Sequence, residues 1–284
     1  MKFTKIQGLG NDFIIINNME NKFSINQFPI LAKRLCKRRI SLGADGFMVV
    51  DYPEGKADFK MRFYNSDGSI GEMCGNGARC IARYAYENKL VGNKMKIENA
   101  SGIVLAEMLK DRLVNIQLSN PTTIKLNVQI EVDDSIYDCS YIELGEPGLP
   151  HLVVNYPELE TIEEPVLRNI GRKLRYHKNF PKGANVNFVK VKDKSTAIVK
   201  TYERGVEDFT LACGTGSAST AVALLLSGQI DGTSVRILNP GGELFIEIDI
   251  LDEKIDKLYL IGDTNIIAVG EILDEDIKQY IPLE

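Results

Sequence analysis

The chain has 284 residues, which suits one large domain or two of ordinary size. Apolar residues make up 44% and charged residues 26%, a balance typical of soluble globular proteins. The net charge of −5 gives no basic footprint for nucleic acid and no attraction to an anionic membrane. The N-terminus lacks an apolar signal-peptide core, and the longest apolar runs are too short to span a bilayer. We therefore expect a cytoplasmic protein without nucleic-acid or membrane partners.

In the first half, the predicted elements alternate strands with two helices. In chain order they are a buried strand at 12–17, a helix at 27–39, a turn and strand at 43–51, a strand and turn at 59–69, a helix at 75–88, and strands at 94–98, 103–108 and 113–118.

The second half repeats this order. Its predicted elements are a buried strand at 150–155, a helix at 164–174, a turn and strand at 183–191, a strand and polar turn at 196–208, a helix at 214–229, and strands at 234–238, 243–250 and 257–262.

The spacing of landmarks makes the repeat quantitative. Cys74 follows Gly10 by 64 residues, and Cys213 follows Pro150 by 63. The pattern predicts two copies of one strand-rich unit, each with one main helix. We expect an α/β (α+β) protein of two similar domains, 1–119 and 120–272. They would be related by a pseudo-two-fold axis, each a barrel-like sheet around its helix, with the active site in the interdomain cleft.

Five cysteines bear on the chemistry of this cleft. The odd number and the absence of an export signal argue against a disulfide framework. With only two histidines in the chain, we do not expect a Cys/His metal cluster either. Cys36 and Cys80 lie on predicted helix faces beside apolar residues, so we interpret them as core. Cys74 and Cys213 each stand before a glycine turn at a helix start, and the repeat would place them on opposite sides of one cleft.

A helix N-terminus lowers the pKa of a thiol from about 8.5 toward neutrality, and its N–H groups bind a carboxylate. One thiolate and one thiol, on opposite faces of a carbon beside that carboxylate, could remove an α-proton and return one to the other face. This chemistry inverts the carbon and needs neither metal nor organic cofactor. Four neighbours at matching places in the repeat could hold the substrate or set a thiol's proton state: Asn65, His151, Glu203 and Arg204.

Seven segments in order resemble the diaminopimelate epimerases: "GLGNDFIIIN", "GADG", "FYNSDGSIGEMCGNGARC", "PHLVV", "GANVNF", "YERG" and "ACGTGSAS". The resemblance implies two similar α/β domains and a cofactor-independent isomerase that converts LL- to meso-diaminopimelate, in the lysine and cell-wall pathway. It also implies that the last strand, near 265–273, and the tail 273–284 return to the first domain. Oligomeric state stays open, with a homodimer as one option.

The same resemblance assigns the site residues. It implies that Cys74 and Cys213 are the acid/base pair, with His151 beside them and Glu203 among the catalytic residues. The residues implied to bind the carboxylate through their backbone are Gly75, Asn76, Gly214 and Thr215. The residues implied to contact the substrate, several of them at its distal end, are Asn11, Asn65, Asn185, Glu203 and Arg204.

One departure from the family pattern leaves the substrate open. The family commonly has Gly-Asn-Pro-His before the buried strand of the second half, whereas Leu149 takes the Asn place here. Leucine cannot hydrogen-bond, so lanthionine or histidine remains an alternative substrate. A thiol redox protein cycling a Cys74–Cys213 disulfide and a non-catalytic amino-acid-binding protein are alternatives of other classes. "GTGSAST" lacks the Gly-Lys-Ser/Thr ending of a phosphate loop.

Overall fold

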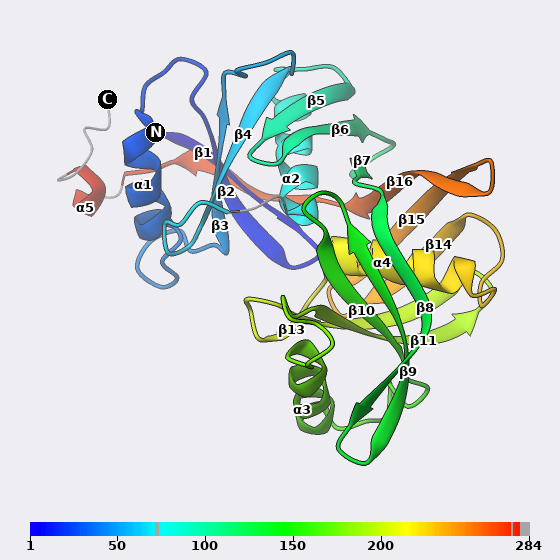
Figure 1. The fold of residues 1–284 in the computed structure, drawn as a ribbon. Helices are drawn as coiled ribbons and strands as arrows, with labels where there is room; N and C mark the ends of the chain where they lie inside the picture. The colour runs from blue at the N-terminus through cyan, green and yellow to red at the C-terminus, as the bar shows by residue number, and fades with distance from the viewer. Residues whose placement is uncertain (72–73, 274, 279–284) are drawn as a thin grey trace. The chain divides into compact units, whose positions relative to one another are not determined.

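The chain folds as two compact units. A computed structural model describes residues 1–71, 74–273 and 275–278 (Figure 1). The first unit comprises Met1–Ile116 and the chain from Gly262 on, and the second comprises Gln117–Ile261. No helix in the described ranges is long and apolar enough to cross a membrane.

The elements of the first unit are β1 (Lys2–Gly8), β2 (Asn11–Asn17), the 3-10 turn Ile25–Gln27, α1 (Phe28–Leu35), β3 (Gly46–Asp51), β4 (Phe59–Asn65), α2 (Gly75–Glu87), β5 (Lys94–Asn99), β6 (Gly102–Met108), β7 (Leu113–Leu118), β17 (Asn265–Glu271) and α5 (Glu275–Lys278).

Helix α2 is the centre of the first unit. It packs against β1, β2, β3 and β6, and every residue from Asn76 to Ala85 except Arg83 is buried. Strand β2 runs parallel to β3, β3 antiparallel to β4, β4 parallel to β5, and β5 antiparallel to β6. Helix α1 packs against β3 and β4. The sheet of this unit therefore surrounds a single main helix, as the sequence predicts.

The elements of the second unit are β8 (Pro121–Val132), β9 (Ser135–Leu144), β10 (Leu149–Asn155), α3 (Glu164–Arg175), β11 (Asn185–Asp193), β12 (Thr196–Glu203), β13 (Asp208–Thr210), α4 (Gly214–Leu226), β14 (Ser234–Asn239), β15 (Gly242–Leu251) and β16 (Lys254–Asp263).

Helix α4 occupies the matching place in the second unit. It packs against β9, β10, β11, β12, β14 and β15, and its small and apolar residues are buried on nearly every side. Strand β10 runs parallel to β11, β11 antiparallel to β12, β12 parallel to β14, and β14 antiparallel to β15. This is the same sequence of directions as in the first unit, which confirms the repeat of two similar units.

The chain returns to the first unit near its end. Strand β17 pairs antiparallel with β1, and Ile272 and Ile277 lie in the hydrophobic core with Phe3 and Ile14. Because β17 belongs there, the units divide after Ile116 and Ile261, whereas the sequence suggested divisions after 119 and 272. Residues 279–284 of the expected returning tail lie outside the described residues.

Candidate active site

Cys74 is the N-terminal cap of α2. Its backbone is extended, with φ −115° and ψ 120°, and the N–H of Gly77 donates to its Sγ at 3.5 Å. The side chain is half-buried. Since the first N–H groups of a helix lack partners within the helix and carry positive partial charge, this position stabilises an anionic sulfur.

Cys213 caps α4 with nearly the same geometry. Its φ and ψ are −117° and 113°, and the N–H of Gly216 donates to its Sγ at 3.4 Å. The hydroxyl of Thr215 lies 3.6 Å from the same sulfur. Each unit therefore presents one thiol at a positive helix end, as expected from the two glycine turns.

The other three cysteines are core residues. Cys36, Cys80 and Cys139 are buried. Burial raises the pKa of Cys36 and of Cys139 to about 12, and it raises the pKa of Cys80 well above its usual range. These sulfurs stay protonated at neutral pH, and the prediction that Cys36 and Cys80 pack in the core is confirmed.

Asn11 lies beside Cys74. The Cys74 Sγ is 3.7 Å from the Asn11 Oδ1, and the Asn11 Nδ2 donates to Asp45 at 2.8 Å. Asp45 in turn pairs with Arg38. The amide of Asn11 is thus oriented with its oxygen toward the sulfur. A protonated Cys74 can donate to it.

Asn76 and Gly75 form the first turn of α2. The side chain of Asn76 is buried, and its Oδ1 accepts from the Arg79 Nη2 at 2.8 Å. Arg79 also donates to the carbonyl of Gly75 at 3.3 Å. Arg79 is fully buried, and burial lowers the pKa of its guanidinium. Sequence reasoning missed Arg79, the fifth residue of α2, whose side chain reaches back to the first turn. A cation so close to a helix N-terminus opposes the helix dipole and is itself a signal.

Two polar residues end equivalent strands. Asn65 is the last residue of β4, and its Nδ2 donates to the hydroxyl of Ser69 at 2.9 Å within the turn. Glu203 is the last residue of β12, and burial raises the pKa of its carboxyl group. A raised pKa suits a carboxyl group that exchanges a proton or stands near another anion.

The side chain of Asn185 stabilises the turn that carries Arg204 through hydrogen bonds. Its Oδ1 accepts from the backbone N–H of Arg204 at 2.8 Å, and its Nδ2 donates to the carbonyl of Pro150 at 3.3 Å. The guanidinium of Arg204 reaches the carbonyl of Lys182 at 3.4 Å. The buried amide of Asn185 therefore bonds to backbone at both ends. A direct contact of that amide with substrate stays a prediction.

His151 is fully buried at the start of β10. Burial, together with the charge of Arg204, lowers its pKa to about 3, so the imidazole is neutral at physiological pH. Its Nδ1 lies 3.3 Å from the Asn187 Nδ2, and the Asn187 Oδ1 accepts from the Thr201 hydroxyl at 2.9 Å. Sequence reasoning missed Asn187 and Thr201, both of them buried.

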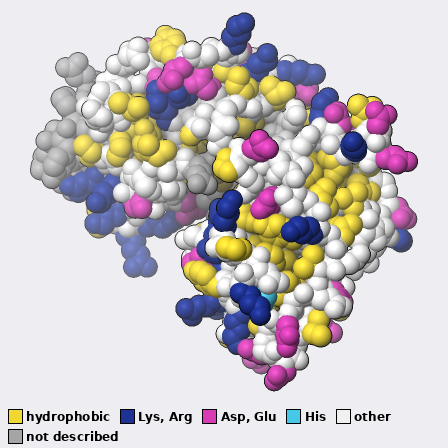
Figure 2. Space-filling model, in the orientation of Figure 1, with side chains coloured by type: hydrophobic (Ala, Val, Ile, Leu, Met, Phe, Trp, Pro, Cys, Tyr) yellow, Lys and Arg dark blue, Asp and Glu magenta, His cyan; other side chains and the backbone are white. Residues whose placement is uncertain are grey.

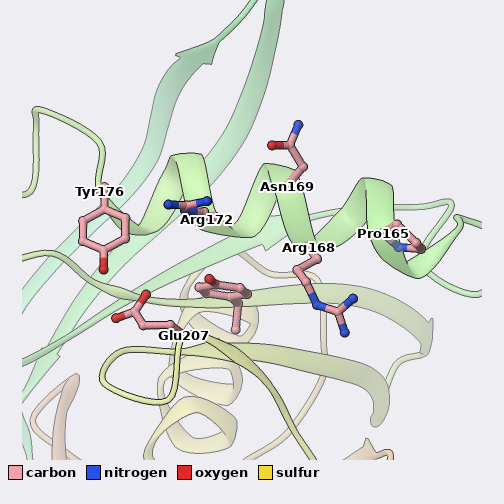
Figure 3. A pocket seen from close by; sticks show the side chains of 7 residues that line it. Pro165, Arg168, Asn169, Arg172, Tyr176 and Glu207 are labelled. Atoms are coloured by element: carbon pink, nitrogen blue, oxygen red, sulfur yellow. The ribbon is translucent and has the colours of Figure 1, made fainter.

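The turn between β12 and β13 also borders a surface cavity of about 460 Å³. Figure 3 shows it between α3 and this turn, with Arg168, Arg172 and Tyr176 on the helix side and Glu207 opposite. Glu207 accepts from Arg175 at 3.1 Å and from the N–H of Gly205 at 3.0 Å. None of the predicted site residues lines this cavity. On the face that Figure 2 shows, acidic and basic side chains are both present over both units.

The chain matches the model of the diaminopimelate epimerase family over residues 3–124 and 146–267. The diaminopimelate epimerase of Aquifex aeolicus (strain VF5) is 37% identical over 289 residues, covering 99% of this chain and all of the relative. That of Archaeoglobus fulgidus (strain ATCC 49558 / DSM 4304 / JCM 9628 / NBRC 100126 / VC-16) is 36% identical, covering 98% and 99%.

Solved structures share the fold at low identity. A PhzF-family phenazine biosynthesis protein of Bacillus anthracis superposes with a TM-score of 0.71 at 14% identity, covering 96% of this chain and 99% of the other. A hydroxyproline epimerase of Agrobacterium vitis, solved with trans-4-hydroxy-L-proline, gives 0.68 at 14%, covering 96% and 90%. Because it matches the family model over most of its length and a curated relative at 37% identity, the chain belongs to the diaminopimelate epimerase family.

Proposed function

We propose that the protein is an isomerase that interconverts LL- and meso-diaminopimelate, with Cys74 and Cys213 as the acid/base pair. The observation that carries this proposal is the matched capping geometry of the two cysteines, in a chain that belongs to the family. A role in lysine biosynthesis and a cytoplasmic location belong to the same proposal.

The chemistry balances without any other reactant. A thiolate removes the proton from the α-carbon and becomes a thiol, while the other thiol gives its proton to the opposite face and becomes a thiolate. Between these steps the electron pair rests on the carboxylate as an enediolate. N–H donors at a helix end are suited to stabilise this charge because they are oriented before the reaction begins. The mechanism requires both sulfurs to reach one α-carbon.

The two thiols would titrate as one coupled system, because a mechanism in which both sulfurs reach one α-carbon requires them to be close enough to interact. Each turnover leaves the protonation states of the pair exchanged. The forward and reverse reactions therefore start from opposite states of the pair. Inactive protonation states would be those with two thiols or two thiolates. This predicts a bell-shaped dependence of kcat/KM on pH.

Leu149 bears on how the distal end of the substrate is recognised, because it stands where the family commonly has Asn. Leu149 is the first residue of β10 and is half-buried. Its side chain has no donor or acceptor, so we assign distal recognition to Asn65 and Arg204, with Asn185 holding the backbone of Arg204 in place.

The experiment is a panel of amino acids incubated with the enzyme in deuterium oxide. The panel holds LL- and meso-diaminopimelate, lanthionine, histidine, glutamate and aspartate, and proton NMR follows loss of the α-proton signal. We expect exchange with diaminopimelate at least 100-fold faster than with the others. Faster exchange with lanthionine or histidine would replace the substrate and keep the mechanism. Absence of exchange with every compound would overturn the proposed function.

A further inference from the structure

We infer that Asn187 is a positioning residue for the Cys213 side of the reaction: its amide fixes His151 with the proton on Nε2, and it contacts the first turn of α4. The link to catalysis rests on the proposed function, whereas the tautomer of His151 does not.

The orientation of the Asn187 amide follows from one neighbour. The atom assigned as Nδ2 lies 3.2 Å from the carbonyl oxygen of Leu152. A carbonyl oxygen can only accept a hydrogen bond, so the NH₂ group and not the oxygen must face it. The Oδ1 then faces Thr201, whose hydroxyl donates to it at 2.9 Å.

This orientation decides the tautomer of His151. The second hydrogen of the Asn187 NH₂ group points to the His151 Nδ1 at 3.3 Å. That nitrogen must offer a lone pair, so a neutral ring carries its proton on Nε2. The low pKa of the buried ring keeps it neutral.

The His151 Nε2 is buried and has no hydrogen-bond partner within the described ranges. An unpaired buried N–H loses its hydrogen bonds to water without replacement, which is unfavourable. The His151 Nε2–H is therefore available to donate a hydrogen bond to a group from outside the chain, such as a carboxylate of the substrate.

Asn187 also touches the helix that carries Cys213. A Cβ atom added to Gly216 would lie 2.2 Å from the Asn187 Oδ1 and 3.2 Å from the Thr201 hydroxyl. The same Gly216 donates its N–H to the Cys213 sulfur at 3.4 Å. The side chain of Asn187 is thus separated from the cap of α4 by a single glycine backbone, so its position restricts the first turn of that helix.

The first unit lacks this polar group. Strands β2 and β10 have the same length and burial pattern, and the third residue of each pairs with the first residue of β3 or β11. His151, Asn187 and Thr201 therefore correspond to three apolar residues, which are Phe13, Met48 and Phe63. A Cβ on Gly77, the counterpart of Gly216, would make ordinary contacts at 3.4 Å with Met48 and 3.6 Å with Phe13. The polar group belongs to the Cys213 side alone, so the two thiols have different surroundings.

The first test needs only the wild-type enzyme. The chain has two histidines, His151 and His177, so ¹⁵N-histidine labelling gives two sets of imidazole signals. We expect the His151 ring at pH 7 to show a protonated Nε2 and an unprotonated Nδ1. A His151 ring with its proton on Nδ1, or doubly protonated, overturns the inference whatever the activity.

Two variants test the link to catalysis. Asn187→Asp keeps the size of the side chain but replaces the donor to Nδ1 by an acceptor, and we expect the proton of His151 to move to Nδ1. Asn187→Met copies the first unit and removes the amide, which covers the case in which the Asp variant does not fold. Either variant should lower kcat by about 10- to 100-fold with a smaller change in KM, because a displaced group slows the chemical step.

The matched control is Asn155→Asp, at the exposed end of β10. It introduces the same charge on β10, the strand that carries His151 and pairs with the β11 strand of Asn187, and should leave the His151 signals and kcat unchanged. Folded Asn187 variants with the kcat of the control would overturn the positioning role. A wild-type enzyme that exchanges no α-proton while His151 shows the expected tautomer would instead overturn the proposed function.

Discussion

Cysteine is a weak choice for a helix N-terminal cap, since Ser, Thr, Asp and Asn accept hydrogen bonds better than a thiol. Cys74 and Cys213 nevertheless cap the central helices of the two units through N–H···S bonds of 3.5 and 3.4 Å. Their recurrence at equivalent places is explained by chemistry and not by helix stability.

The variant Cys74→Ser separates these two roles. Serine keeps the cap and strengthens it, so the free energy of unfolding should stay the same or rise by about 0.5–1 kcal/mol. Its hydroxyl is a far weaker acid than a thiol and stays un-ionised near neutral pH, so it neither removes nor donates the proton readily, and inversion should slow by a factor of about 10²–10⁴. Urea unfolding and a racemisation assay measure the two effects.

Cys139→Ala is the matched control for loss of a cysteine. Cys139 is a buried core residue, so this variant should lose stability and keep its rate of inversion. A Cys74→Ser enzyme with the wild-type rate of inversion, or an inactive Cys139→Ala enzyme that is still folded, contradicts the assignment.

His151 makes a prediction about pH. Its pKa in the folded protein is about 3, below the ordinary value of 6.5, so the unfolded chain binds more protons between these values. Its contribution to stability is therefore complete above pH 6.5 and is lost as the pH falls toward 3. The free energy of unfolding of the wild-type protein should fall between pH 6.5 and pH 4.5. In a His151→Gln variant this fall should be smaller by about 2–3 kcal/mol.

Urea unfolding of wild type, His151→Gln and His177→Gln at both pH values measures this difference. The His177→Gln protein keeps His151 and should show the steeper wild-type loss. Equal losses in all three proteins would contradict burial of a neutral His151.

At the scale of the element, helices α2 and α4 both have glycine as their third residue, but the side chains around the two glycines differ. Gly216→Ala would bring a methyl group against the Asn187 Oδ1, whereas Gly77→Ala, at the same helical position, meets only ordinary contacts. We expect Gly216→Ala to lower the unfolding free energy by about 1–3 kcal/mol, as overpacking in a core does. Gly77→Ala should be neutral or stabilising, because alanine favours a helix.

Thermal unfolding of the two variants, measured side by side, checks this expectation. Equal destabilisation by both substitutions would mean that Asn187 does not restrict the first turn of α4. Gly216→Ala should also shift the ¹⁵N signals of His151, whereas Gly77→Ala should not.

The sequence predicted those elements whose hydrophobic pattern is strong. The helices after Cys74 and Cys213 and the strand near 150–155 lie where expected. The helix at 27–39 is shorter, ending at Leu35, and Arg39 beyond it has a positive φ of 71°. The hairpin of β8 and β9 was not predicted, because many of its residues are polar and exposed and give little apolar signal.

The candidate site was predicted to a similar extent. Cysteines before glycine turns carry a visible signal, and the family resemblance supplied Asn11 and Asn185. Asn187 gave no such signal, because "NVNFV" reads as alternation of polar and apolar residues. In the structure all five residues are buried, so the two polar ones, Asn185 and Asn187, must find partners in three dimensions that a sequence alone does not reveal.

At the scale of the whole molecule, each unit supplies one capped thiol, and in the proposed reaction the pair performs a task that neither could perform alone. Inversion with two bases takes the proton from one face and delivers a different proton to the other. A single base would return the same proton or exchange substrate and product alike.

The most direct test follows both isotopes at low conversion of LL-diaminopimelate in deuterium oxide. We expect that the meso product carries deuterium at the inverted carbon while the remaining substrate keeps its hydrogen. Cys74→Ala and Cys213→Ala should each abolish formation of product. A product that retains the substrate's own hydrogen, or either single variant that inverts the substrate at the wild-type rate, would contradict inversion by the two cysteines.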